Sequence, residues 1–181
     1  MLTREALVER IDRGESIDLL FFWGHTPKSE TIDASCLSQW FPAAFVVDGV
    51  RYATAEHFMM AEKARTFGDD VALDRVLAAK TPAEAKAVGR SVRDYDDAVW
   101  EKARGLAVVR GNVAKFGENA ALGAFLANTG DRVLVEASPS DTVWGIGLAA
   151  SHADARSPAK WRGRNLLGFA LMAARETLAA R

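Results

Sequence analysis

Cysteine and histidine are scarce in this sequence, which contains one cysteine and three histidines. A single thiol, Cys36, cannot form an intramolecular disulfide, and the scattered His25, His57 and His152 do not make a metal-binding motif. We therefore expect a reducing, cytoplasmic setting, no disulfide and no bound metal. We also expect no cofactor.

The sequence lacks an excess of charge of either sign. Its 23 lysine and arginine residues almost balance 24 aspartate and glutamate residues, which gives a net charge of −1. No global basic field exists to hold nucleic acid or an anionic membrane, so an anionic ligand must be recognised locally. No apolar run reaches the length of a membrane span, and the charged, amphipathic start MLTREALVERIDRGES is unlike a targeting segment.

Apolar residues, by contrast, are abundant. They make up 49% of the 181 residues, enough for one compact domain with a buried core. Thr3 is placed to cap a helix over residues 3–13, and residues 17–23 form an apolar run typical of a buried strand. The pair Asp48-Gly49 between two short apolar runs predicts a β-hairpin at 44–53, because a type I′ turn needs positive φ at both central residues.

The starts of four more helices are marked by expected capping residues, namely Thr54, Thr81, Asn119 and Asn165. A long helix is also expected over about 96–116, and a strand over 132–137. Together these elements predict a single α+β domain that is rich in helices and has a small, mostly antiparallel sheet.

One face of the helix expected over 55–67 carries two opposite charges. A turn of about 100° per residue places Glu56 and Lys63 on a face that otherwise consists of methionine and phenylalanine side chains. The two charges are seven residues apart, about 10 Å along the axis, which is too far for an ordinary i,i+4 pair. Apolar surroundings raise the pKa of a carboxyl group and lower the pKa of an ammonium group, as acid–base or nucleophilic roles require. The alternative is that both side chains extend from the helix margin into solvent.

The segment SPSDTVWGIGL, directly after the expected strand, offers a third ionisable group. Asp141 lies in this turn, Trp144 is suited to stack on a flat base or sugar, and Gly145 and Gly147 let a ligand approach the backbone. An acid with a second acid or an amine around a flat aromatic ring suits cleavage of a bond to an anomeric carbon, whose transition state is a flattened cation. The alternative is an Asx turn, with Asp141 holding its own loop and Trp144 in the core.

Two further candidates are weaker. Trp40, just before the hairpin, is either a stacking surface for a ligand or a core residue. His57, in the first turn of its helix, should have its pKa lowered by the helix dipole, and it is either a neutral hydrogen-bonding residue or part of the helix cap.

Four segments together resemble the YbiA/NADAR family: SQWFPAAFVVDGVRYATAEHFMMAEKA, VAKFGENAALGAFL, LVEASPSDTVWGIGL and RGRNLLGFALMAAR. They occur in order and with the spacing of the family, between Phe21 and Arg175. The resemblance implies a YbiA-like α+β domain over residues 17–181, preceded by an N-terminal helical extension over residues 1–16.

The resemblance implies that the protein is an N-glycosidase. Members similar to the bacterial YbiA type hydrolyse the N-glycosidic bond of ribosylamino-pyrimidine phosphates, which are early intermediates of riboflavin biosynthesis. Other members remove ADP-ribose from guanine bases. We therefore expect a small ribosylated pyrimidine as the substrate. Two alternatives stay open: removal of ADP-ribose from guanine, including guanine in nucleic acid, and non-catalytic binding of NAD or ADP-ribose.

The resemblance also implies site residues. The family's acidic and lysine positions fall on three residues that we expect to be catalytic: Glu56, Lys63 and Asp141. We expect the substrate to be bound by Trp40, His57, Trp144, Gly145 and Asn165. The chain departs from the family pattern at two positions, Gln39 in place of a common asparagine and Glu62 in place of a common glutamine. Both departures concern substrate preference more than activity.

Overall fold

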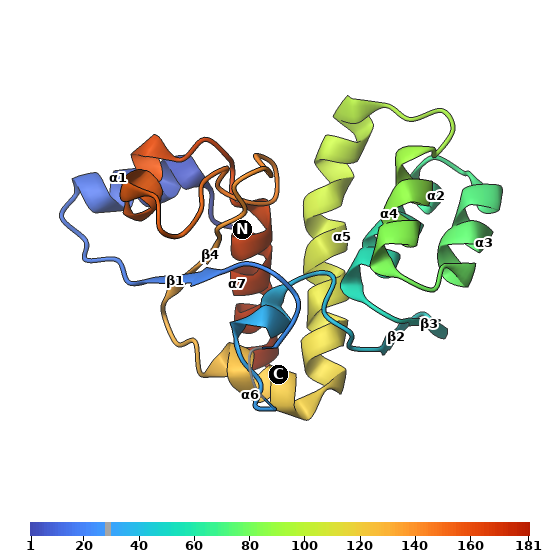
Figure 1. Cartoon of the computed structure of the whole chain (residues 1–181), viewed down its shortest axis with the longest axis horizontal. Coiled ribbons are helices and arrows are strands. Elements are labelled where there is room, and N and C mark those ends of the chain that lie inside the picture. The colour runs from blue at the N-terminus through green and yellow to red at the C-terminus, as the bar shows by residue number, and fades with distance from the viewer. Residues whose placement is uncertain (28–29) are drawn as a thin grey trace. The chain divides into compact units, whose positions relative to one another are not determined.

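The structure is a computed structural model that describes residues 1–27 and 30–181 (Figure 1). The chain forms two compact units, one made of residues 1–38 and 121–181 and the other of residues 39–120. The predicted α+β class and the richness in helices are confirmed. The strand pairing differs from the expected mostly antiparallel sheet, because the described strands form two separate pairs, one parallel and one antiparallel.

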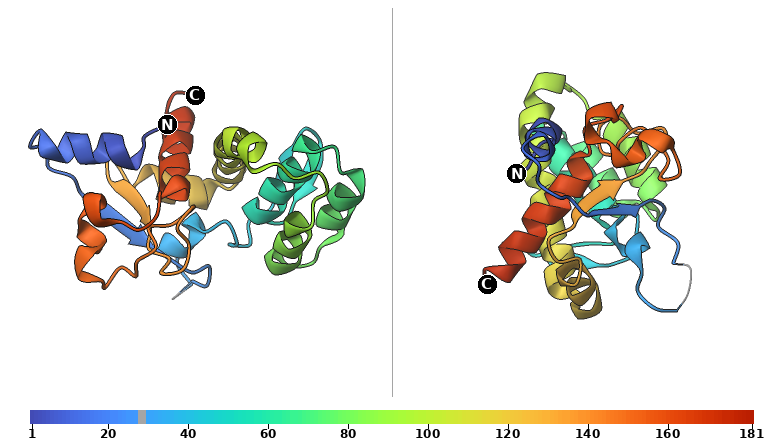
Figure 2. Two further views of the ribbon diagram at one scale, coloured as in Figure 1. Left: turned by 90° about the horizontal axis from the view of Figure 1, so that it is seen from above. Right: turned by 90° about the vertical axis from the view of Figure 1, so that its left-hand side faces the viewer.

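The unit of residues 39–120 is an antiparallel hairpin followed by four helices. Strands β2 (Phe45–Val47) and β3 (Val50–Tyr52) pair around Asp48 and Gly49, whose φ angles of 51° and 77° confirm the predicted turn. The helices are α2 (Ala55–Thr66), α3 (Asp70–Ala78), α4 (Pro82–Arg90) and the long α5 (Asp97–Glu118). Helix α2 contacts each of the other three (Figures 1 and 2). It is therefore the central element of this unit.

Aromatic rings form the core beneath the hairpin. Tyr52 and Phe58 meet edge to face, with ring centroids 5.0 Å apart, and Phe45 lies about 6 Å from both. Gly111 lets α5 lie against this cluster, since a Cβ there would be 2.5 Å from a ring carbon of Phe58. The hairpin, α2 and α5 are therefore held by one shared core.

Helix α3 was not predicted from the sequence. It buries only Ala72 and Val76, so its apolar pattern is short. Its cap is Asp69, whose Oδ1 accepts hydrogen bonds from the backbone nitrogen of Ala72 (3.1 Å) and from Nη2 of Arg93 (2.8 Å). The Arg93 guanidinium lowers the pKa of Asp69, so the cap keeps its charge in more acidic solution than an ordinary aspartate does.

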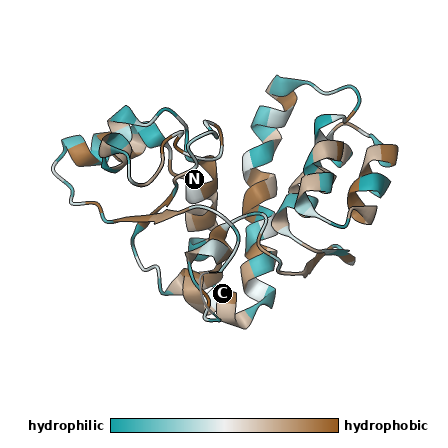
Figure 3. Ribbon diagram, viewed as in Figure 1, coloured by the Kyte–Doolittle hydropathy of each residue, from teal (hydrophilic) through white to brown (hydrophobic). Residues whose placement is uncertain are grey.

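The second unit, residues 1–38 and 121–181, is built on a parallel strand pair. Strand β1 (Leu19–Phe22) pairs with β4 (Val133–Glu136), with Leu19 opposite Val133. Helix α7 (Leu166–Ala179) packs against β4 (Figure 2), and the strands and this helix are largely apolar (Figure 3). The core of this unit therefore lies between α7 and the strand pair.

Shorter elements complete this unit: α1 (Arg4–Asp12), η1 (Ala34–Leu37), α6 (Ala120–Ala127), η2 (Ala153–Arg156) and η3 (Pro158–Lys160). Thr3 caps α1 as predicted, because its hydroxyl accepts a hydrogen bond from the nitrogen of Ala6 (3.2 Å). Nη1 of Arg4 donates to the carbonyl of Trp161 (2.8 Å), so α1 packs on its own unit. The division into an extension over 1–16 and a domain over 17–181 stays a prediction.

Asn165 joins the strand pair to α7 in a way that the sequence did not indicate. It precedes α7 but makes no side-chain cap, and its φ of 55° is left-handed. Its Oδ1 instead accepts from the nitrogen of Glu136, and its Nδ2 donates to the carbonyl of Leu134, both at 2.9 Å. A Cβ at Gly168 would lie 2.0 Å from that same carbonyl. The start of α7 therefore lies directly on β4.

Replacing Asn165 should destabilise the protein. In Asn165→Ala, two buried backbone groups of β4 lose their partners and a side chain less tolerant of left-handed φ is introduced, so the unfolding free energy should fall by about 2–4 kcal/mol. Asn165→Gly loses the same bonds without the backbone strain and should lose less stability. Urea denaturation checks both variants, and equal losses would contradict a contribution from the backbone conformation.

Candidate active site

The predicted site residues fall into two groups, one in each unit. Trp40, Glu56, His57 and Lys63 belong to residues 39–120. Asp141, Trp144, Gly145 and Asn165 belong to the unit that contains residues 121–181.

Glu56 lies in the first turn of α2 and is only 3% exposed. Its backbone nitrogen donates to the carbonyl of Gln39 (3.0 Å), which joins the segment around Trp40 to the helix start. The amide of Gln39 donates in turn to Oδ1 of Asn112 on α5 (3.1 Å). Gln39 is buried, so this departure from the family pattern has a structural role within its unit. The positive end of the helix dipole favours a negative charge at Glu56.

Lys63 lies near the end of the same helix and is half-buried. Its Nζ lies 3.9 Å from the ring centroid of Tyr95. Burial lowers the pKa of Lys63, while the negative charge of Asp97 opposes that effect. The environment therefore shifts Lys63 toward the neutral amine, as the sequence analysis expected of an amine in apolar surroundings.

His57 is buried and held through both ring nitrogens. Nε2 lies 3.2 Å from the carbonyl oxygen of Ala79, and Nδ1 lies 2.8 Å from the hydroxyl of Thr54. Because a carbonyl only accepts, Nε2 carries the proton and Thr54 donates to Nδ1 of the neutral ring. Burial lowers the pKa of His57, against the opposing effects of Ala79 and Glu84. Sequence reasoning had attributed the lowered pKa to the helix dipole, and burial is the larger cause here.

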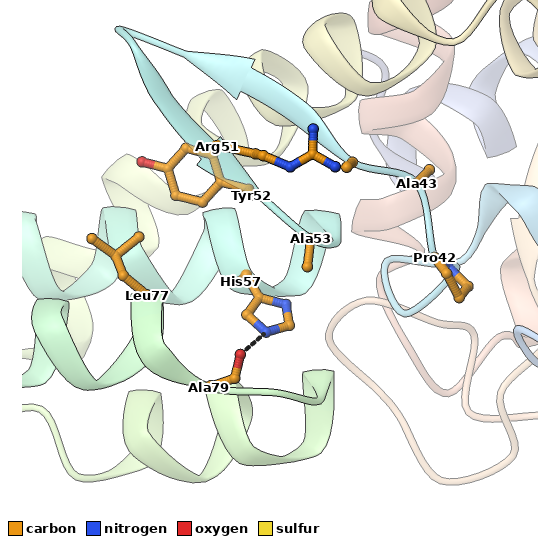
Figure 4. A pocket seen from close by; sticks show the side chains of 9 residues that line it. Pro42, Ala43, Arg51, Tyr52, Ala53, His57, Leu77 and Ala79 are labelled. Atoms are coloured by element: carbon orange, nitrogen blue, oxygen red, sulfur yellow. Dashed lines mark hydrogen bonds between the residues drawn. The ribbon is translucent and has the colours of Figure 1, made fainter.

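A cavity of about 360 Å³ opens beside His57 (Figure 4). Its wall is made of the segments 42–44 and 51–53 with His57, Leu77 and Ala79. Neither Glu56 nor Lys63 lines it. Its position next to His57 is consistent with the predicted contact between that residue and a substrate, which stays a prediction.

Asp141 holds the turn after β4 by the Asx arrangement that the sequence left open. Its Oδ1 accepts hydrogen bonds from the backbone nitrogens of Val143 (2.9 Å) and Trp144 (2.7 Å). Its own nitrogen donates to Oγ of Ser138 (3.2 Å). Both bonds of the carboxylate use Oδ1, so Oδ2 is not needed to form the turn. A structural role and a catalytic role are therefore compatible at this residue.

The glycines of this turn serve close packing of the backbone. A Cβ at Gly145 would lie 2.9 Å from the carbonyl of Glu136, and a Cβ at Gly147, whose φ is 66°, would lie 3.0 Å from the Cβ of Arg162. The side of Gly145 where a ligand was expected to approach is therefore filled by the protein's own backbone. Gly145 and the buried Asn165 support the turn, and substrate contact by either stays a prediction.

The start of α7 is occupied by the same turn. The backbone nitrogens of Asn165 and Leu167 donate to the carbonyls of Gly145 (3.1 Å) and Trp144 (3.1 Å). Helix starts often bind phosphate through such free nitrogens, but here they are used internally. Trp144 is half-buried and retains some exposed surface, as a stacking residue requires.

Sequence reasoning missed two residues in the unit of residues 39–120. Tyr95 lies over Lys63 although it precedes α5 by two residues, and no helical spacing links it to α2. Lys115 of α5 is fully buried, with its Nζ 5.0 Å from the ring centroid of Phe116 and 5.7 Å from that of Phe41. Its spacing from Val108 and Asn112 on one helix face was the available signal.

Two negative findings apply to residues 1–27 and 30–181. No group of three or more histidine, cysteine, aspartate or glutamate side chains is arranged there to hold a metal ion. No helix in that part of the chain has the length and apolar character needed to cross a bilayer.

The lowered pKa of His57 predicts a pH dependence of stability. The unfolded chain binds a proton at the ordinary pKa of about 6.5, but folded His57 binds it only at lower pH. The stabilisation is therefore complete above about pH 6.5 and is lost as pH falls through the folded pKa. Urea denaturation between pH 7.5 and 5 should show a loss that His57→Gln reduces. The exposed control His152→Gln should keep it, and an unchanged slope in His57→Gln would contradict the assignment.

Comparison with known proteins supports the family. The sequence profile of the NADAR domain matches residues 21–179. An N-glycosidase of Acanthamoeba polyphaga mimivirus is 38% identical over 167 residues, which cover 90% of this chain and 97% of the viral protein. A riboflavin biosynthesis protein of Vibrio vulnificus is 33% identical over 144 residues, which cover 78% of this chain and 35% of that protein.

The fold comparison agrees with these sequence matches. The NMR structure of the E. coli protein YbiA is similar with a TM-score of 0.70 and 25% sequence identity, over 92% of this chain and 88% of that one. The profile match includes residues 40–63 and 141–165, which contain the two groups of predicted site residues. The chain belongs to the NADAR domain family.

Proposed function

We propose that this protein is an N-glycosidase that hydrolyses the N-glycosidic bond of ribosylamino-pyrimidine phosphates of riboflavin biosynthesis. The reaction class is supported by the mimivirus relative, which is called an N-glycosidase and matches almost along its whole length. The substrate class is supported by the Vibrio relative, which is called a riboflavin biosynthesis protein. We propose Glu56, Lys63 and Asp141 as the catalytic residues.

The observation that carries the proposed chemistry is the half-buried Lys63 with its lowered pKa, on the same helix as the buried Glu56. In one route the neutral amine attacks the anomeric carbon, and the bond from that carbon to the base nitrogen breaks. Glu56 or Asp141 donates a proton to the departing nitrogen. The proton released by the attacking amine passes to the ring oxygen as the sugar opens to a protonated imine. Water then hydrolyses the imine and regenerates the amine.

A second route keeps Lys63 protonated. One of the two carboxyl groups, Asp141 or Glu56, then takes a proton from water, which attacks the anomeric carbon directly, and the other carboxyl group donates its proton to the departing nitrogen. The ammonium group of Lys63 contributes electrostatically. Borohydride distinguishes the routes, since only an imine is reduced to a stable adduct on Lys63 during turnover.

A paired assay tests the function. The purified protein is offered a ribosylamino-pyrimidine phosphate and ADP-ribosylated guanosine in separate reactions, and the released sugar is quantified. We expect preferential release of ribose phosphate, and a loss of about a hundredfold or more in Lys63→Ala. Lys102→Ala, which changes an exposed lysine of α5, is the matched control. Preferential release of ADP-ribose would mean that the substrate is an ADP-ribosylated guanine. Release of sugar from neither compound would mean that the protein is a non-catalytic binding module.

Asp141 variants separate catalysis from folding. Asp141→Ala removes the oxygen that accepts both hydrogen bonds of the turn and should lower the unfolding free energy by about 1–3 kcal/mol. Asp141→Asn keeps a side-chain oxygen for these bonds and should recover most of that stability, yet remain about a hundredfold or more less active. Asp131→Asn, an exposed change in the same unit, serves as the reference. Full activity in Asp141→Asn would restrict Asp141 to its structural role.

A further inference from the structure

Tyr95 forms a contact with Lys63 that the proposed chemistry does not yet use. Nζ of Lys63 lies 3.9 Å from the ring centroid, well within the range of a cation–π interaction. Such an interaction stabilises the ammonium form and not the neutral amine. The ring therefore acts on the charge state of Lys63 as well as on its position.

The ring of Tyr95 is itself held on two sides. Its hydroxyl donates to Oδ1 of Asp97 (2.7 Å), and its ring packs against Phe67 with centroids 5.3 Å apart. Phe67 directly follows α2, and Asp97 begins α5. Tyr95 therefore bridges the helix that carries Lys63 and the neighbouring helix, although 43% of its own surface is exposed.

We propose that Tyr95 is a positioning residue for Lys63, held by Asp97 and Phe67, whose ring keeps the ammonium form of Lys63 in place and populated. This inference rests on the proposed role of Lys63 in catalysis. It means that two opposing influences act on one amine. Burial favours the neutral form, and the ring with the carboxylate behind it favours the charged form.

The charged groups around this pair come from each element that packs on α2. Asp97 of α5 acts on Lys63, and Asp96 and Arg104 act with it on Tyr95. Charged side chains on α2 and on the elements that pack against it have contacts of their own, such as Asp69 with Arg93, Lys86 with the ring of Trp40, and Glu62 with Arg65 and Arg110. Tyr95 and Asp97 are thus the groups whose replacement should change the ionisation of Lys63.

The first test is the pH dependence of Lys63 labelling, which needs no substrate. Acylation by acetic anhydride is followed by mass spectrometry of the Lys63 peptide, with the exposed Lys102 as the internal reference. Tyr95→Leu keeps apolar bulk but removes the aromatic ring. It should shift the labelling midpoint to lower pH, so that about two- to fivefold more Lys63 is neutral at a pH below the midpoint. Tyr95→Phe keeps the ring but loses the hydroxyl that donates to Asp97, so its midpoint should lie between those of the wild type and Tyr95→Leu. An unchanged midpoint in Tyr95→Leu overturns the inference.

The Asp97→Asn variant separates the effect of the Tyr95 ring on Lys63 from the effect of the Asp97 carboxylate. We expect its midpoint to move in the same direction as that of Tyr95→Leu, because the carboxylate also favours the ammonium form. A shift in Asp97→Asn without a shift in Tyr95→Leu would assign the effect to the carboxylate alone and overturn the role of the ring.

The second test is the pH profile of sugar release by the same variants. If the neutral amine reacts, the acidic limb of Tyr95→Leu should move to lower pH, and the rate on that limb should rise about two- to fivefold relative to the plateau. If the ammonium group is required, the alkaline limb should move to lower pH and the rate on it should fall by the same factor. Profiles identical to wild type overturn the inference. A wild-type protein that releases no sugar instead rejects the proposed function, and the labelling midpoints still decide the role of Tyr95.

Discussion

Each polar group that is buried in this protein must recover the hydrogen bonds that it loses to water, and this constraint shapes both units. Asn165 meets it by bonding to the backbone of β4, which places α7 on the strand pair. Gln39 and Asn112 meet it through each other, which attaches the segment before the hairpin to α5. The backbone of Gln39 also accepts from Glu56, and the backbone of Asn165 donates to Gly145, so these buried residues lie directly beside candidate site residues.

The same constraint makes some side chains of the site rigid and leaves others adaptable. His57 uses both ring nitrogens, and Asp141 uses one oxygen to hold the turn that carries it. Lys63 is different, because its Nζ faces an aromatic ring, which attracts a charge without fixing a proton. A group whose proton is not committed to a hydrogen bond can change its charge state during a reaction.

The glycines of the turn after β4 can be interpreted in two ways, as space for a ligand or as space for the protein's own packing. In the turn after β4, Gly145 and Gly147 were expected to admit a ligand, but a Cβ at Gly145 would lie 2.9 Å from the carbonyl of Glu136 and a Cβ at Gly147 would lie 3.0 Å from the Cβ of Arg162. The turn is compact because its carbonyl groups accept hydrogen bonds from the first backbone nitrogens of α7. Its conformation is therefore determined by internal packing, and the ionisable Asp141 and the half-buried Trp144 are its candidate functional parts.

The sequence by itself determined the α+β class, the hairpin at Asp48-Gly49, the caps at Thr3 and Thr54 and the placement of Glu56 and Lys63 on one helix, α2. These features depend on local φ preferences and helical spacing, which neighbouring residues decide. Only the tertiary structure decided that β1 pairs with β4 in parallel, that Asn165 bonds to a strand and that Tyr95 covers Lys63. Each of these joins residues far apart in the chain or on different elements, and no local pattern records such contacts. Helix α3 escaped prediction for a related reason, since it buries too few residues to show a clear period.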